Sequence, residues 1–174
     1  MKRKMELYEY SLWQLFWKSG LTGFMIFAFA EIIILFVCLY NGYNSKDIVF
    51  LLKFMNVFAL VVFYARPLFC LFQVIKQQSV TGIYWKNRND FHREEDQREW
   101  FVRFDGGGFI LYHKSYIGKI LRTIKEDVMD GDGYARGTCY ILNFEDITGK
   151  QRKIKFCDRI YEVEFRKWFG KKKK

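Results

Sequence analysis

Few residues in this sequence have the types and spacing that a chemical site requires. Gly106, Gly107 and Gly108 resemble a phosphate-cradling loop, but no Lys-Ser/Thr pair or helix signal follows them. Asp127, Asp130 and Asp132 resemble the aspartates of a calcium-binding loop, but their spacing is wrong for an EF-hand and the glutamate at the twelfth position is missing. Both segments are better explained as turns. The four cysteines form no Cys-x-x-Cys pair, and there are only two histidines. The sequence therefore predicts no metal, no cofactor and no catalytic residue.

Two charged residues, Glu31 and Arg66, interrupt otherwise apolar stretches. At the centre of a bilayer a lone charge costs about 2.5 to 3.5 kcal/mol. Counted from Tyr40 and Phe54, the depths of the two residues differ by about 4.5 Å at the helical rise, which an arginine side chain can cover. We expect an interhelical Glu31–Arg66 ion pair that clamps the two helices together. The alternatives are a proton or ion path, or a docking point for another membrane protein.

Basic residues gather toward the C-terminus. The net charge is +10, and from Gln151 onward ten Lys/Arg face only three acidic residues. Such a surface beside a bilayer favours anionic lipid headgroups or an acidic protein partner, whereas nucleic acid is not favoured. The plainer alternative is that the charge serves only solubility and topology. The expected binding surface consists of Arg152, Lys153, Lys155, Arg159, Arg166 and Lys167.

The elements that position these residues fall into two unlike parts. Hydrophobic residues make up 51% of the chain and charged residues 28%, which is compatible only with segregation along the sequence. Leu21–Tyr40 and residues 50–74 are each apolar and long enough to cross a hydrocarbon core of about 30 Å as a helix. A signal peptide fits the first stretch poorly, because the stretch is too long and starts late. A pair of core helices in a soluble protein also fits poorly, because two apolar runs of this length are too much for a domain this small.

The short loop Asn41–Asp47 makes the two spans antiparallel neighbours. Lys and Arg flank the outer ends of the spans more densely than the loop, so both termini are expected in the cytosol. The composition favours a bacterial cytoplasmic membrane. Residues 1–19 are rich in aromatics and predict a short interfacial helix, unless the first helix simply starts early. Residues 20–76 would form the transmembrane hairpin.

Alternating apolar residues from 79 to 170 predict a cytosolic antiparallel β domain, followed by a basic tail at 171–174. Glycine- and aspartate-rich turns separate the strand candidates. An amphipathic helix over 159–169 would close the domain. The charged segment 86–99 is either a loop or an extension of the second span. The predicted strands are 80–86, 98–105, 109–115, 118–128, 137–145 and 151–157.

The ending CYILNFEDITGKQRKIKFCDRIYEVEFRKWF reads as two strands joined by a turn and followed by a closing helix. With the preceding hairpin, this layout resembles bacterial two-span membrane proteins that carry a pleckstrin-homology-like (PH-like) domain, over residues 98–169. The resemblance implies an α+β membrane protein of a kind that commonly binds lipids or proteins and seldom catalyses a reaction.

The sequence thus predicts a non-enzymatic, membrane-anchored interaction or regulatory protein. Its expected partners are the bilayer, anionic headgroups, and a protein partner or a second copy of the chain. Two alternatives stay open: a toxin immunity protein acting at the membrane, and a small subunit of a transport or secretion complex. Catalysis on lipid is the weakest alternative.

Overall fold

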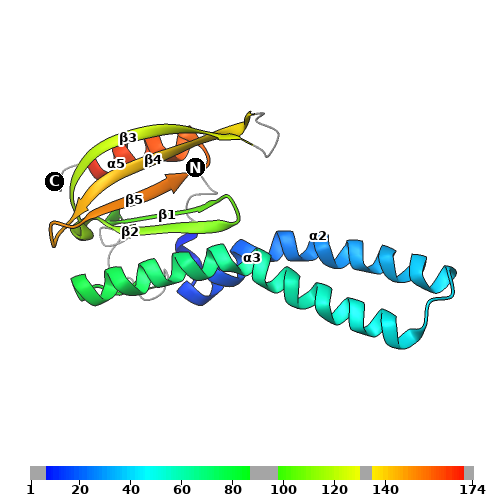
Figure 1. Cartoon of the computed structure of the whole chain (residues 1–174). Coiled ribbons are helices and arrows are strands. Elements are labelled where there is room, and N and C mark those ends of the chain that lie inside the picture. Colours follow the sequence, from blue (N-terminus) through cyan, green and yellow to red (C-terminus); the bar gives the residue numbers. More distant parts are fainter. Residues whose placement is uncertain (1–6, 87–97, 130–134, 171–174) are drawn as a thin grey trace.

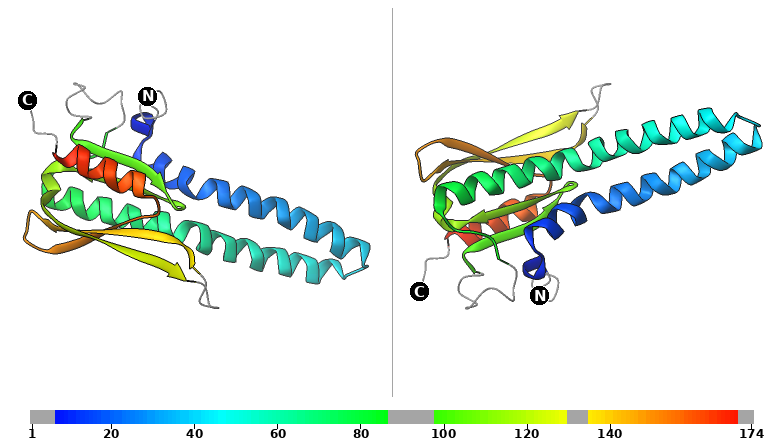
Figure 2. Two further views of the ribbon diagram at one scale, coloured as in Figure 1. Left: turned by 90° about the horizontal axis from the view of Figure 1, so that it is seen from above. Right: turned by 90° about the horizontal axis from the view of Figure 1, so that it is seen from below.

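A long helical hairpin projects from a β-rich body (Figures 1 and 2). This computed structural model describes residues 7–86, 98–129 and 135–170. The 3-10 turn η1 and the closing helix α5 both lie at the body, at the opposite end from the turn of the helical hairpin (Figure 1). The elements in chain order are η1 (Leu7–Glu9), α2 (Leu12–Tyr40), α3 (Ser45–Thr81), β1 (Trp100–Asp105), β2 (Gly108–His113), η3 (Lys114–Tyr116), β3 (Ile117–Met129), β4 (Ala135–Asp146), β5 (Gln151–Phe156) and α5 (Arg159–Gly170).

Both hairpin helices are long and apolar enough to cross a membrane. Helix α2 begins at Leu12, where Ser11 and Gln14 form a capping box. From Leu12 the helix runs without interruption to Tyr40. The first span therefore starts early, and the predicted separate interfacial helix is not formed by these residues. Helix α3 runs from Ser45 to Thr81 and contains Pro67, so it both begins and ends beyond the predicted span of 50–74.

The two helices approach closely at two glycines of α2. A Cβ atom at Gly20 would stand 2.7 Å from the ring of Tyr64, and one at Gly23 would stand 2.5 Å from the ring of Phe63. Small residues at such positions let helices pack tightly where no hydrophobic effect drives them together. This contact places Tyr64 of α3 level with the first turns of α2, so the last part of α3 extends past the start of α2.

The β1–β2 hairpin forms a layer between the helices and the three-stranded sheet β3–β4–β5 (Figure 1). Its residues alternate between two cores because successive side chains of a strand point to opposite faces. Trp100, Val102 and Leu111 face the helices. Phe101 and Tyr112 face the second sheet. This explains why both faces of the predicted strand at 98–105 are apolar.

Helix α5 closes the two sheets. Phe165 is fully buried, with its ring centroid 5.0 Å from that of Phe101 and 5.6 Å from that of Phe156. Arg103 of β1 binds Glu164 of α5 through Nε at 3.0 Å and Nη2 at 2.7 Å. The fold is therefore α+β, with two apolar helices, two small antiparallel sheets and a C-terminal helix.

Five of the six predicted strands and the C-terminal helix are present, with ends that differ by a few residues. The predicted strand at 80–86 is wrong: helix α3 continues to Thr81, and residues 82–86 form no strand. The helix persists there because Gln77 and Gln78 are buried against the body. Most of the charged segment 86–99 and all of the tail 171–174 lie outside the described residues.

Candidate functional site

The last turns of α3 carry the first wall of a cavity. Phe69, Phe72, Gln73 and Lys76 recur at spacings of three and four, so they share one face of the helix. The opposite side of this segment packs against the β1–β2 layer, where Val74 is buried. Phe69 and Phe72 are each 62% exposed, although they are among the largest apolar side chains.

The facing wall comes from the body. Tyr112 of β2, Tyr116 of η3 and Phe144 of β4 belong to the buried aromatic core, and the start of β5 completes the wall. The cavity between the two walls has a volume of about 510 Å³. The lining residues are Phe69, Phe72, Gln73, Lys76, Tyr112, Tyr116, Phe144, Gln151, Arg152 and Lys153.

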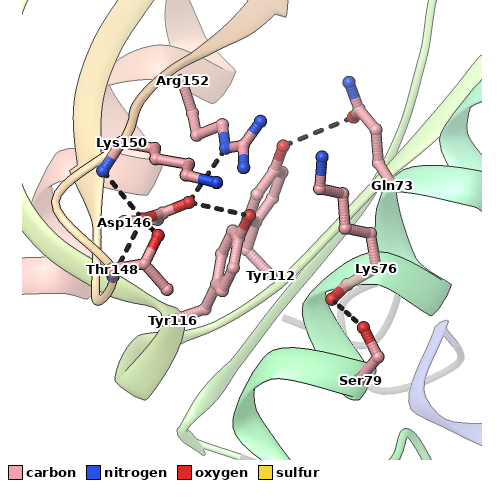
Figure 3. A network of polar contacts seen from close by, with 9 residues as sticks. All are labelled: Gln73, Lys76, Ser79, Tyr112, Tyr116, Asp146, Thr148, Lys150 and Arg152. Atoms are coloured by element: carbon pink, nitrogen blue, oxygen red, sulfur yellow. Dashed lines mark hydrogen bonds and ion pairs between the residues drawn. The ribbon is translucent and has the colours of Figure 1, made fainter.

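Asp146 fixes the position of Arg152 in this wall (Figure 3). The carboxylate is 3% exposed and accepts hydrogen bonds from the backbone N–H of Thr148 at 2.9 Å and of Lys150 at 3.0 Å. Its Oδ2 accepts from Arg152 Nε at 2.9 Å and from the Tyr116 hydroxyl at 3.5 Å. The β4–β5 turn thus holds a buried anion that anchors one guanidinium edge.

The remaining polar groups of the cavity converge on one space. In Figure 3 the ammonium of Lys76, the guanidinium of Arg152 and the hydroxyl of Tyr112 point toward one another from different elements. The Tyr112 hydroxyl donates to Gln73 Oε1 at 3.4 Å, which links β2 to α3. A ligand placed here would therefore touch both the helix and the body.

The electrostatics of the site favour an anion. Burial opposes ionisation of Asp146, but its hydrogen bonds with Thr148, Arg152 and Lys150 outweigh this and hold its pKa well below the usual value. The hydrogen bond to Asp146 raises the pKa of Arg152. Burial raises the pKa values of Tyr112 and Tyr116, so both phenols stay neutral hydrogen-bond donors at neutral pH.

The lining offers cations, phenols and amides but no carboxylate, histidine or thiol. Two cations, Lys76 and Arg152, point into the space (Figure 3), and the buried Asp146 offsets one of them. Lys153 also lines the cavity, but it follows Arg152 in β5, so its side chain points to the other face of the strand. Among the described residues no group of three or more His, Cys, Asp or Glu could hold a metal ion. This arrangement can bind an anionic group next to an apolar surface.

The predicted Glu31–Arg66 ion pair is not formed. Glu31 Oε1 accepts a hydrogen bond from Asn56 Nδ2 at 3.1 Å. The reason lies in the helix start: α3 begins at Ser45, nine residues before the assumed start at Phe54. That shift moves Arg66 about 13.5 Å along the helix, away from the level of Glu31.

Arg66 instead contacts the body. Its Nη2 lies 3.9 Å from Oδ2 of the buried Asp105, and both terminal nitrogens lie 3.6 Å from Sγ of Cys157. Asp105 also accepts the backbone N–H of Cys157 at 2.8 Å. A Cβ at Gly106, whose φ is +53°, would stand 2.5 Å from Arg66 Nη1. Arg66 therefore joins α3 to the β1–β2 turn.

The predicted basic surface is divided by the fold. Arg152 and Lys153 line the cavity. Arg166 is bound to Glu162 of its own helix and to Thr123 of β3. The other three, Lys155, Arg159 and Lys167, are exposed.

Sequence reasoning missed the cavity residues contributed by α3 and β2: Gln73, Lys76 and Tyr112. The sequence held one signal for the α3 residues: Lys76 follows Phe69 and Phe72 at helical spacing, so the three share one face of the helix. Comparison of the chain with protein-family models, curated proteins and solved structures found no match.

Proposed function

We propose that this chain is a non-enzymatic, membrane-anchored module whose cavity binds the headgroup of an anionic lipid. Helices α2 and α3 would cross the bilayer, and the β-rich body would lie in the cytosol with both termini, as the flanking Lys and Arg favour. The composition favours a bacterial cytoplasmic membrane. Two antiparallel sheets closed by a C-terminal helix support a PH-like assignment of the body.

One observation carries the proposal. Two cations, Lys76 and Arg152, point into a cavity of about 510 Å³ that no carboxylate lines and whose helical wall continues directly into an apolar helix that could span a membrane. A cation near an anionic membrane surface contributes about 1 kcal/mol to binding. The cavity therefore combines charge for a phosphate with proximity to the lipids that carry one.

The test measures binding of fluorescent phosphatidylglycerol and phosphatidylcholine to the full chain in a neutral detergent. We expect phosphatidylglycerol to bind more tightly. The variant Lys76→Gln should lower its affinity about fivefold, since one cation contributes about 1 kcal/mol and 1.4 kcal/mol corresponds to a factor of ten. The Lys76 ammonium points into the cavity, so the loss should be large at low salt and smaller at high salt.

The matched control is Lys155→Gln, which removes the same charge from an exposed site outside the cavity. It should change affinity far less. Equal binding of the two lipids by the unmodified chain would refute the proposal. Equal losses in the two variants would instead assign binding to the overall charge and not to the cavity.

A further inference from the structure

Arg66 sets the level at which α3 leaves the bilayer. Its guanidinium contacts Asp105 and Cys157 of the β-rich body, so the body begins at this residue. The segment from Ser45 to Arg66 covers about 30 Å at the helical rise, which matches the hydrocarbon thickness. Everything in α3 beyond Arg66 then lies in the headgroup layer or above it.

An apolar stripe nevertheless continues along α3 beyond Arg66. Leu68, Phe69, Phe72 and Ile75 are all exposed there, from 44% to 62%. Phe72 stands about 9 Å past Arg66 along the helix, farther than a headgroup layer of about 5 to 7 Å reaches. Without a further occupant, this stripe would place large apolar side chains in water.

The stripe and the cavity form one continuous surface. Phe69 and Phe72 belong to both, and Lys76 follows Phe72 by one helical turn at the charged end. The apolar end of the stripe joins the membrane-spanning part of α3, and the cationic end meets Arg152. An occupant must therefore be apolar toward the bilayer and anionic away from it.

We infer that this surface holds one whole anionic phospholipid, raised from the cytosolic leaflet with its headgroup in the cavity and its acyl chains along the stripe. This inference rests on the proposed function and adds the chains to it. The apolar stripe provides a path from the bilayer without a polar barrier, so a lipid can move up it without leaving apolar surroundings. A partner helix would have to bring its own acidic group to match Lys76 and Arg152.

The experiment compares three probes on the full chain in detergent: long-chain phosphatidylglycerol, its water-soluble headgroup glycerol 3-phosphate, and inorganic phosphate. The chain should bind one equivalent of phosphatidylglycerol, with native mass spectrometry giving the stoichiometry. It should bind this lipid at least about tenfold more tightly than either soluble anion, because the apolar contact adds to the charge. Phe69→Ser/Phe72→Ser should remove most of that difference.

The control is Ile160→Ser, which removes an exposed apolar side chain from α5, 63% exposed and outside the cavity. It should retain the full preference for the lipid. If the phenylalanine variant keeps that preference while Lys76→Gln loses binding, the cavity holds a headgroup alone and the inference is wrong, although the proposed function stands. If the unmodified chain is a dimer that the phenylalanine variant dissociates, the stripe is a protein contact and the inference is also wrong. Failure of every probe to bind overturns both.

Discussion

Asp146 shows how one buried carboxylate can organise a binding wall. It accepts hydrogen bonds from the β4–β5 turn and holds Arg152 by Nε at 2.9 Å. The guanidinium is thereby oriented before any ligand arrives, which lowers the entropy that binding must overcome. The same contacts make the stability of the body depend on the ionisation of Asp146.

Replacing Asp146 with asparagine should lower the free energy of unfolding at pH 7 by about 2 kcal/mol, because hydrogen bonds to a charged acceptor are lost. In the native chain the pKa of Asp146 is lowered. Its contribution is therefore complete above the unfolded pKa of about 3.9 and is lost as the pH falls below that value through the folded pKa. Thermal unfolding in detergent, followed by tryptophan fluorescence, should show a gap between the two chains at pH 7 that narrows below about pH 4.

The control for this prediction is Glu126→Gln, an exposed carboxylate on β3. Its unfolding temperature should follow that of the native chain at every pH. If Asp146→Asn shows the same gap at pH 3 and at pH 7, the buried carboxylate does not carry the stabilisation.

At the scale of elements, turns that depend on the local sequence were predictable, whereas helix ends and charge partners that depend on tertiary contacts were not. The turn at Asp146–Gly149 was predicted because aspartate and glycine favour turns by themselves, and Gly149 has a φ of +77°. The end of α3 was missed because buried Gln77 receives the N–H of His113 at 3.2 Å, a contact made across the fold. The Glu31–Arg66 pairing failed for a related reason: an error of nine residues in one helix start changed the partners of both charges.

The contact between α2 and α3 depends on the glycine positions of α2. Gly23→Val should weaken it, since a Cβ would stand 2.5 Å from the ring of Phe63 and overpacking costs about 1 to 3 kcal/mol. Adding Phe63→Ala should restore part of the loss by making room for the valine. The unfolding temperature in detergent measures both effects.

Ala30→Val is the control for this pair, because Ala30 lies on the exposed side of α2. It should have little effect on the unfolding temperature. A loss equal to that of Gly23→Val, or no rescue by Phe63→Ala, would contradict the close approach of the helices at Gly23.

On the scale of the whole molecule, the candidate site exists only through the fold. Its lining comes from α3, β2, η3, β4 and β5, which span residues 69 to 153. No periodicity or motif joins such distant segments, so the sequence indicated Arg152 and Lys153 as basic residues but could not place Lys76 beside them. The two-part plan was predictable because apolar and charged residues are separated along the chain.

The proposed placement in the membrane predicts opposite accessibility for the two ends of the molecule. Two crossings would put η1 and α5 on one side of the membrane and the turn at residues 41–44, which lies at the opposite end of the molecule (Figure 1), on the other. The native Cys157 is exposed in the body, so a membrane-impermeant maleimide should label it only after the membrane is permeabilised. Tyr43→Cys in a Cys157→Ser chain should be labelled in intact cells, since Tyr43 is exposed in the turn. Labelling of Cys157 in intact cells would place the body outside, where the lysines that flank the spans do not favour it. It would also remove the cytosolic leaflet as the source of the bound lipid.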